Sequence, residues 1–498
     1  MKLYLVGHHY QYAVEQMMMT LFPGQKPEYP TTPPTWDQSM AQVELFPRGH
    51  EVVAHAKLWW NGGVYEAERR EPTSRLTGGL EDDRVRQRVV RLAFYDAGVE
   101  ALGQEPPWGA LTGVRPVKLP TRQMANGDTP QQARDTLTTL YRVSPSRADL
   151  AMDCAHAALH VLHSLEPKQL SLYVGIPFCP TRCAYCSFIS ADVKGALALV
   201  EPYVDALCRE IEEAGAQLRQ NGVTIKTAYM GGGTPTTLSA AQMDRVLTHM
   251  ERHLPLEGCV EFTVEAGRPD TITREKLEVL RTHHIHRISI NPQTMEDSVL
   301  KAMGRAHTAQ EITAAMDLTR EVYGGMVNMD LIAGLPTDTV EGFARTLEQV
   351  VAMAPANITV HTLALKKGAK LMEEQGRLCA PQEVAQMLAL AESTLRGAGY
   401  VPYYLYRQKY MSGSFENVGW AKPGCVCAYN IIMMEELQSV LSLGAGGITK
   451  LVNPATGKID RLSNPKYPKE YLDSWEKICQ HKVQAAQFQA RIYPPTLP

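Results

Sequence analysis

The chain has 498 residues and a formal net charge of −3, and this length predicts two or three domains. Hydrophobic residues make up 44% and charged residues 21% of the sequence, which is ordinary for a globular protein with a sizeable core. The sequence has no Lys/Arg-rich run that would favour nucleic-acid binding. It also has no run of about eighteen uncharged apolar residues that would favour a membrane span. We expect a cytoplasmic protein, because the first residues lack the pattern of a signal peptide and the ten cysteines are too few for a disulfide scaffold of this length.

The first 165 residues mix strand-like and helix-like patterns. Strands are predicted over 42–46 and 52–60, and apolar residues at three- and four-residue spacing predict helices over 85–102 and 144–165. We find no known chemistry in this region. We therefore expect an α+β N-terminal domain over 1–165 with no assigned role.

From about residue 168 the pattern becomes a regular alternation of short β-type runs and helical stretches. Such an alternation predicts parallel strands joined by crossover helices, in a full or partial barrel or an open sheet. We expect this α/β barrel over 166–380 and a C-terminal extension over 381–498 that covers it. The predicted strands are 170–176, 225–230, 260–265, 285–290, 327–332 and 358–363, and the predicted helices between them are 202–219, 240–253, 274–282, 309–323 and 340–353.

Three cysteines lie close together directly after the first of these strands, at Cys179, Cys183 and Cys186. Iron–sulfur sites normally use four thiolates, so three leave one iron of a [4Fe–4S] cluster open to a small ligand. The alternatives are a zinc site or unrelated buried thiols. Zinc requires a fourth protein ligand, and the nearest upstream histidine is His163. The pattern favours the iron–sulfur cluster.

The CxxxCxxC pattern after a strand, with Tyr185 before the last cysteine, resembles the radical SAM superfamily. The run Tyr173–Cys179 resembles one branch of it, the anaerobic (oxygen-independent) coproporphyrinogen III oxidases or dehydrogenases and their relatives. The segments 111–116, 406–409 and 415–419 are similar to the HemZ-type dehydrogenases of that branch. The resemblance implies a partial (β/α)6 TIM-like barrel, S-adenosylmethionine as a cofactor, and a flavodoxin or ferredoxin-type electron donor.

Glycine and polar residues follow the later predicted strands, where barrel and open-sheet enzymes place their chemistry. Each residue has an ordinary explanation when it is taken alone: a glycine turn, a solvated strand end, an Asn-Pro turn or a helix-end arginine. Asp330 is harder to explain, because a charge inside an apolar strand needs a partner. Read through the resemblance, the positions that hold the cofactor are Tyr173, Tyr185, Gly232, Gly233, Thr234, Glu265, Gln293, Arg305 and Asp330, and Tyr173 is also the candidate catalytic residue.

The sequence departs from the best-studied members of that family at two positions. Phe188 stands where they have a fourth cysteine, and Gly175 stands where they have a histidine. The fourth cysteine is not a cluster ligand in the family, so the departure weakens the substrate assignment and not the cluster. Cys425 and Cys427 are either a redox pair or packing thiols.

The resemblance implies a reaction on a tetrapyrrole. The leading hypothesis is the oxygen-independent oxidative decarboxylation of coproporphyrinogen III propionates to vinyl groups, which gives protoporphyrinogen IX. Two alternatives stay open, a haem chaperone of the same family and a radical methyltransferase that opens haem. Basic residues would pair with the propionates, and the candidates are Arg115, Lys118, Arg407 and Lys409.

Overall fold

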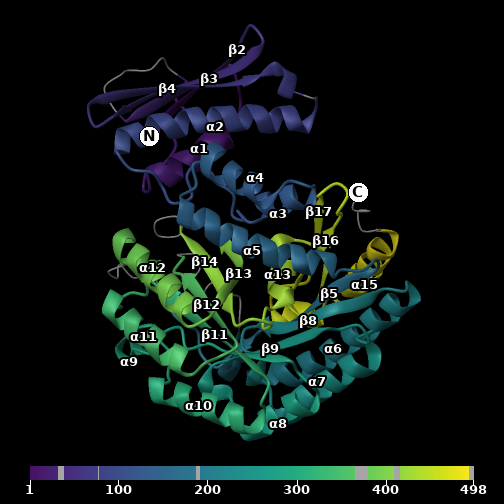
Figure 1. The fold of residues 1–498 in the computed structure, drawn as a ribbon. Coiled ribbons are helices and arrows are strands. Elements are labelled where there is room, and N and C mark those ends of the chain that lie inside the picture. The colour runs from purple at the N-terminus through teal and green to yellow at the C-terminus, as the bar shows by residue number, and fades with distance from the viewer. Residues whose placement is uncertain (32–38, 77, 187–190, 365–378, 409–414, 493–498) are drawn as a thin grey trace. The chain divides into compact units, whose positions relative to one another are not determined.

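The structure is a computed structural model that describes residues 1–31, 39–76, 78–186, 191–364, 379–408 and 415–492. The chain divides into two compact units, of which the first comprises Met1–Met152 with Gly413–Phe415 and the second begins at Asp153. Each unit has its own main sheet (Figure 1). Of the helices in the described ranges, none is both long and apolar enough to cross a membrane.

The first unit is built on a four-stranded sheet in the order β1-β2-β3-β4. β1 runs parallel to β2, and the other neighbours are antiparallel. Two predicted strands correspond to β2 and β3, and two predicted helices correspond to α2 and α5, of which α5 crosses the boundary between the units. The bounds are β1 (Lys2–Val6), α1 (Gln11–Leu21), β2 (Met40–Arg48), β3 (Glu51–Trp60), β4 (Gly63–Pro72), α2 (Leu80–Leu102), α3 (Lys118–Ala125), α4 (Pro130–Asp135) and α5 (Pro145–His163).

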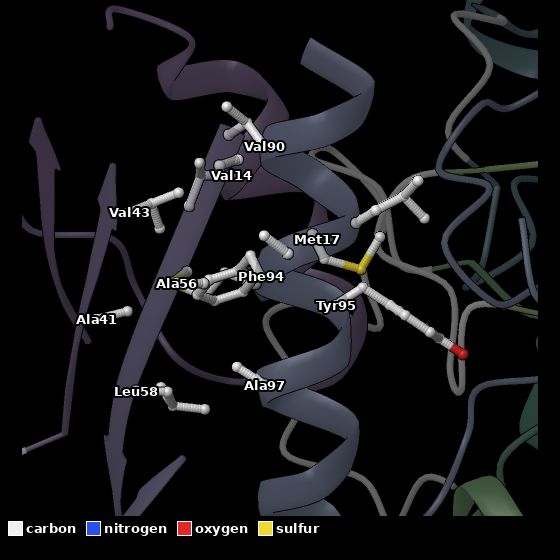
Figure 2. Packing of buried hydrophobic residues seen from close by; sticks show 14 of the residues in the cluster. Val14, Met17, Ala41, Val43, Ala56, Leu58, Val90, Phe94, Tyr95 and Ala97 are labelled. Carbon is white, nitrogen blue, oxygen red and sulfur yellow. The ribbon is translucent and has the colours of Figure 1, made fainter. Parts of the chain in front are cut away.

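The core of the first unit lies between one face of this sheet and the helices α1 and α2. Alternate residues of a strand point to one face, so Val43 of β2 and Ala56 of β3 face the helices together. Figure 2 shows Phe94 of α2 and Met17 of α1 against this apolar row. The burial of that row explains why these segments form a sheet with one helical cover.

The second unit carries an eleven-stranded sheet in the order β13-β14-β12-β11-β10-β9-β8-β5-β15-β16-β17. Its six central strands β5, β8, β9, β10, β11 and β12 are parallel to one another, which confirms the predicted α/β fold class. They read as near-continuous apolar runs because a parallel sheet is covered on both faces. The bounds are β5 (Gln169–Ile176), β8 (Thr224–Gly232), β9 (Glu261–Gly267), β10 (Arg287–Ile290), β11 (Met326–Ala333) and β12 (Asn357–Thr362).

The helices that alternate with these strands lie along the outer side of the curved sheet (Figure 1). Several begin at a capping box, in which a Ser or Thr hydroxyl and a Gln or Glu side chain satisfy the free N–H groups of the first turn. Ser239 with Gln242 and Thr308 with Glu311 are two such pairs. The bounds are α6 (Val193–Gln220), α7 (Ala240–His253), α8 (Arg274–Thr282), α9 (Asp297–Ala302), α10 (Ala309–Val322) and α11 (Val340–Ala352).

The last hundred residues extend this sheet at both edges. β15 pairs in parallel with β5, and β16 and β17 follow it as antiparallel strands. At the other edge β14 and β13 add antiparallel strands beside β12. The bounds are α12 (Pro381–Gly397), β13 (Val401–Arg407), β14 (Glu416–Ala421), α13 (Ala428–Glu435), β15 (Val440–Leu443), β16 (Ile448–Val452), β17 (Ile459–Ser463), α14 (Pro468–Leu472) and α15 (Trp475–Arg491).

A buried ion pair ties α15 to α6. Lys482 donates to Glu210 Oε1 over 2.6 Å, and both side chains are fully buried. Tyr471, Asn464 and the backbone N–H of Gly444 also donate to this carboxylate, over 2.5, 3.0 and 2.7 Å. Every oxygen of the buried charge is therefore satisfied, which is the condition under which a buried carboxylate is tolerated.

A second buried ion pair closes the amino ends of the strands. Arg287, the first residue of β10, contacts Glu261, the first residue of β9, over 2.7 Å. Arg287 and Asn357 both donate to the carbonyl oxygen of Cys425, and the buried Cys427 thiol donates to Glu261 Oε1 over 3.0 Å. Cys427 therefore packs in a turn that caps this end of the sheet.

Candidate functional site

The first of the three predicted cluster cysteines is the last residue of β6 (Phe178–Cys179), and the other two follow that strand. Cys179, Cys183 and Cys186 are half-buried, and none of them is in a disulfide. The backbone N–H of Cys186 donates to the carbonyl of Cys183 over 3.1 Å, and that of Ala184 donates to Met303 over 3.1 Å. We call residues 179–186 the cysteine loop.

Within the described residues, no three His, Cys, Asp or Glu side chains converge as the ligands of a single metal ion do. The ligands of a cubane bind different irons, and they are therefore spaced more widely than the ligands of one ion.

The glycine turn after β8 packs directly on the cysteine loop. A Cβ on Gly233 would collide with the carbonyl oxygen of Phe178 and would lie 3.0 Å from Cys179 Sγ. Gly232 has a φ of 115°, which favours glycine. The Thr234 hydroxyl donates to Cys179 Sγ over 3.6 Å. The structure therefore brings Gly233 and Thr234 against the first cysteine, whereas Gly232 packs on the backbone of Ile176 in β5.

Arg305 reaches the cysteine loop from the other side. This buried guanidinium donates through Nη1 to the Tyr185 hydroxyl over 2.7 Å, and the same nitrogen lies 3.9 Å from Cys183 Sγ. Its Nη2 donates to the carbonyl of Asn291 over 2.6 Å. Arg305 and Tyr185, which the sequence places 120 residues apart, thus meet at one cysteine.

Glu265 lies near the carboxyl end of β9. It accepts a hydrogen bond from the Tyr229 hydroxyl over 2.6 Å. Burial raises the pKa of the Glu265 carboxyl to about 7, the Tyr229 hydrogen bond opposes that rise, and the charge of Asp330 adds to it. Tyr173 of β5 stacks on Tyr229, with ring centroids 6.3 Å apart. Glu265 and Tyr173 therefore both contact Tyr229.

Asp330 finds protein partners for its buried charge. Asn328 donates to its Oδ1 over 2.8 Å, and His361 Nε2 lies 3.8 Å from its Oδ2. Burial raises the pKa of the Asp330 carboxyl, but the hydrogen bonds and charge of His361 and the hydrogen bond of Asn328 outweigh burial and lower that pKa. The lowered pKa keeps Asp330 ionised, whereas the raised pKa of Glu265 favours its protonated form below about pH 7.

Gln293 carries a buried side-chain oxygen with no partner. Its backbone sits at a φ of 69°, and its N–H donates to the carbonyl of Asp330 over 2.9 Å. A non-glycine residue at positive φ is uncommon, and a buried acceptor without a donor calls for a ligand or a water. The Gln293 side chain thus offers an unfilled acceptor at the carboxyl ends of the strands.

The sequence analysis did not identify Tyr229 or Asn328 as site residues. Both are uncharged polar side chains inside buried strands, which is a weaker signal than the charge that singled out Asp330. The basic candidates fare differently. Burial lowers the pKa of Arg407 to about 10, Arg115 and Lys118 belong to the first unit, and Lys409, like Phe188, lies outside the described residues.

Gly175 lies against the last parallel strand of the sheet. A Cβ at this position would be 3.0 Å from the carbonyl oxygen of Ala445, which follows β15. A side chain as large as histidine would press on that backbone. The close approach of β15 gives a packing reason for the departure from the family pattern.

Comparisons with known proteins agree with this geometry. The family model for the Radical SAM superfamily matches residues 173–350. The "Oxygen-independent coproporphyrinogen-III oxidase-like protein HemZ" of Bacillus subtilis (strain 168) is 40% identical over 381 residues, which are 76% of this chain and 76% of that protein. The chain belongs to this family of radical SAM proteins.

Other relatives mark the breadth of this radical SAM family. The "Heme chaperone HemW" of Escherichia coli (strain K12) is 28% identical over 316 residues, covering 64% of this chain and 79% of that protein. The solved structure of "Coproporphyrinogen III oxidase (HemN) from Escherichia coli" matches with a TM-score of 0.50 and 23% identity, over 65% of this chain and 72% of that chain. The latter likeness supports the fold.

Membership of this superfamily implies a [4Fe–4S] cluster and S-adenosylmethionine. Three observations show that the residues present fit both groups. The cysteines of the loop form no disulfide, the missing side chain of Gly233 leaves bare backbone beside Cys179, and Gln293 holds an unpartnered acceptor. A cluster on the cysteines would thus have Gly233, Thr234, Tyr185 and Arg305 beside it.

Proposed function

We propose that this protein catalyses the oxygen-independent oxidative decarboxylation of coproporphyrinogen III propionates to vinyl groups, giving protoporphyrinogen IX. The observation that carries this proposal is the 40% identity to the HemZ protein over 381 residues. That match extends well beyond the 178 residues or so of the superfamily domain, residues 173–350. The same proposal places the protein in the cytoplasm and gives it a flavodoxin or a ferredoxin-type protein as electron donor.

The cofactor would be held by the residues that surround the cysteine loop. Cys179, Cys183 and Cys186 would each bind one iron, which leaves the fourth iron for S-adenosylmethionine. The backbone at Gly232 to Thr234 would receive the amine of its methionine part, and Arg305 would pair with its carboxylate.

The adenosyl part would lie along the carboxyl ends of the strands. Glu265 and Asp330 offer acceptors for ribose hydroxyls, and Gln293 offers the unpartnered oxygen described above. Tyr185 would keep the Arg305 fork in place beside the cluster, and Tyr173 would line the pocket at the reacting carbon.

The bound groups supply a carbon radical that removes one hydrogen atom from the β-carbon of a propionate. The propionate then loses carbon dioxide and one electron, which leaves a vinyl group and requires a one-electron acceptor. The protein residues contribute binding, orientation and exclusion of water. Residues 166–380 would carry this chemistry, with residues 1–165 as a separate domain and 381–498 as an extension that covers the barrel.

An anaerobic product assay tests the proposal. Reconstituted protein is incubated with coproporphyrinogen III, S-adenosylmethionine and a reductant, and products are identified by mass spectrometry. We expect vinyl products with one carbon dioxide for each propionate converted. Tight stoichiometric haem binding without vinyl product would favour a chaperone, the function printed for the HemW relatives. Consumption of haem with methyl transfer would favour a ring-opening methyltransferase.

A further inference from the structure

His307 is a buried histidine between two charged side chains of the candidate site. Its side chain is fully buried, and Arg305 Nε lies 3.3 Å from its Nε2. A guanidinium has no acceptor, so His307 must accept that hydrogen bond with Nε2. Its proton is then on Nδ1, which lies 4.0 Å from Asp270 Oδ1 and has no hydrogen-bond partner of its own.

The imidazole is neutral, because burial and the positive charges of Arg305 and Arg268 lower the pKa of His307 to about 4. The charges that face it are those two arginines, Asp270 and, more weakly, Glu311. A neutral ring that accepts from a permanent cation is fixed in one tautomer and one orientation. His307 is therefore a fixed acceptor at physiological pH.

Asp270 links this histidine to the near end of the cysteine loop. Arg268 binds the Asp270 carboxylate with two hydrogen bonds of 2.9 and 3.0 Å. The same arginine donates through Nη1 to the Thr181 hydroxyl over 2.5 Å. The cysteine loop is thus held at Thr181 by Arg268 and at Tyr185 by Arg305.

We propose that His307 is a positioning residue for Arg305. By accepting the Nε–H it fixes the guanidinium plane, so that Nη1 faces the cysteine loop, beside the proposed place of the methionine carboxylate, while Nη2 faces the carbonyl of Asn291. An arginine fork binds a carboxylate well only when its plane is held in register. His307 does not touch the cofactor itself. The inference rests on the proposed role of Arg305 in holding S-adenosylmethionine.

Two substitutions of His307 separate the effect of losing its hydrogen-bond acceptor from the effect of changing its side-chain volume. His307→Leu keeps an apolar side chain of moderate size and removes the acceptor, whereas His307→Gln restores an acceptor. His249→Gln is the matched control, because His249 lies on α7 and contacts Arg245 and Glu212 instead of the site. For each variant, iron content, the electron paramagnetic resonance spectrum of the reduced cluster, and S-adenosylmethionine affinity are measured anaerobically.

We expect His307→Leu to retain its iron, to bind S-adenosylmethionine about tenfold more weakly, and to lose the change that S-adenosylmethionine causes in the resonance spectrum. His307→Gln and the control should stay within about threefold of the parent protein. Parental affinity in His307→Leu would overturn the proposal, and so would a His307→Gln variant as weak as His307→Leu.

If His307→Leu fails to take up iron, the glutamine variant decides: parental iron and affinity support the proposal, and loss of either overturns it. These readouts do not involve a tetrapyrrole. A parent protein that binds S-adenosylmethionine but makes no vinyl product would therefore contradict the proposed function while leaving this test intact.

Discussion

Glu265 keeps its proton up to a pH at which an exposed glutamate has lost it. The pKa of its carboxyl rises from 4.5 to about 7, chiefly because the side chain is buried. Between these two values the folded protein binds a proton that the unfolded chain has released. Stability from this group is therefore highest at low pH and falls as the pH rises through this window.

Replacement of Glu265 by Gln should remove that part of the pH dependence. The shift corresponds to on the order of 2–3 kcal/mol, so the parent protein should lose about that much relative to Glu265→Gln between pH 5 and pH 8. Denaturant unfolding of both proteins at the two pH values measures the difference. Infrared spectra should show a protonated carboxyl band in the parent at pH 6 that the variant lacks. Parallel stability profiles would contradict the assignment.

The cluster assignment also belongs to single residues. Alanine at Cys179, Cys183 or Cys186 removes one of the three proposed thiolate ligands, so reconstituted variants should lose their iron and their broad visible absorption. Cys425→Ser is the matched control. Arg287 and Asn357 donate to the backbone carbonyl of Cys425, which serine keeps. Iron content by chemical assay decides, and full iron in the triple alanine variant would exclude the site.

At the scale of elements, the turn after β8 places bare backbone directly against Cys179. Gly233→Ala would place a methyl group against Phe178 and Cys179. The methyl group would meet backbone atoms of Phe178, which cannot rotate away as a flexible side chain can. The whole cysteine loop must therefore shift. We expect reduced iron retention and at least tenfold weaker S-adenosylmethionine binding, which is on the order of 1.4 kcal/mol.

Gly195→Ala is the control for that experiment. Gly195 lies in α6 with no atom within 4 Å of an added Cβ, and alanine favours a helix over glycine by about 1 kcal/mol. This variant should bind iron and cofactor as the parent does. Equal behaviour of the two alanine variants in a binding titration would show that a methyl group at position 233 does not displace the cysteine loop.

The six central strands could be predicted from the sequence because each is a local apolar run between turn residues. β15 could not, since the strand character of Val440–Leu443 comes from pairing with β5, which lies some 270 positions earlier. The same reason applies in the site. The cysteine and glycine motifs are local, whereas the pairing of Asp330 with His361 depends on the neighbouring positions of β11 and β12.

At the scale of the whole molecule, the second unit depends on its last helix. Lys482→Met leaves Glu210 buried without its cation, and breaking a buried pair from one side costs about 3–5 kcal/mol. We expect a lower melting temperature and a lower denaturant midpoint. The double variant Lys482→Met/Glu210→Gln should recover part of that loss, because no charge then stays buried. A single variant as stable as the parent protein would contradict this account.

The Glu210 site also sets an order of events during synthesis. Its carboxylate is made at least 234 residues before its partners, which are Gly444, Asn464, Tyr471 and Lys482. Until they emerge from the ribosome, α6 must keep this charge in water, and β5 has no β15 beside it. Contacts so distant in sequence form slowly, after their intervening loop has closed. The unit that holds the cysteine loop therefore reaches its final packing only after α15 has been made, and a chain stopped short of α15 exposes an incompletely packed unit of the kind on which chaperones and proteases act.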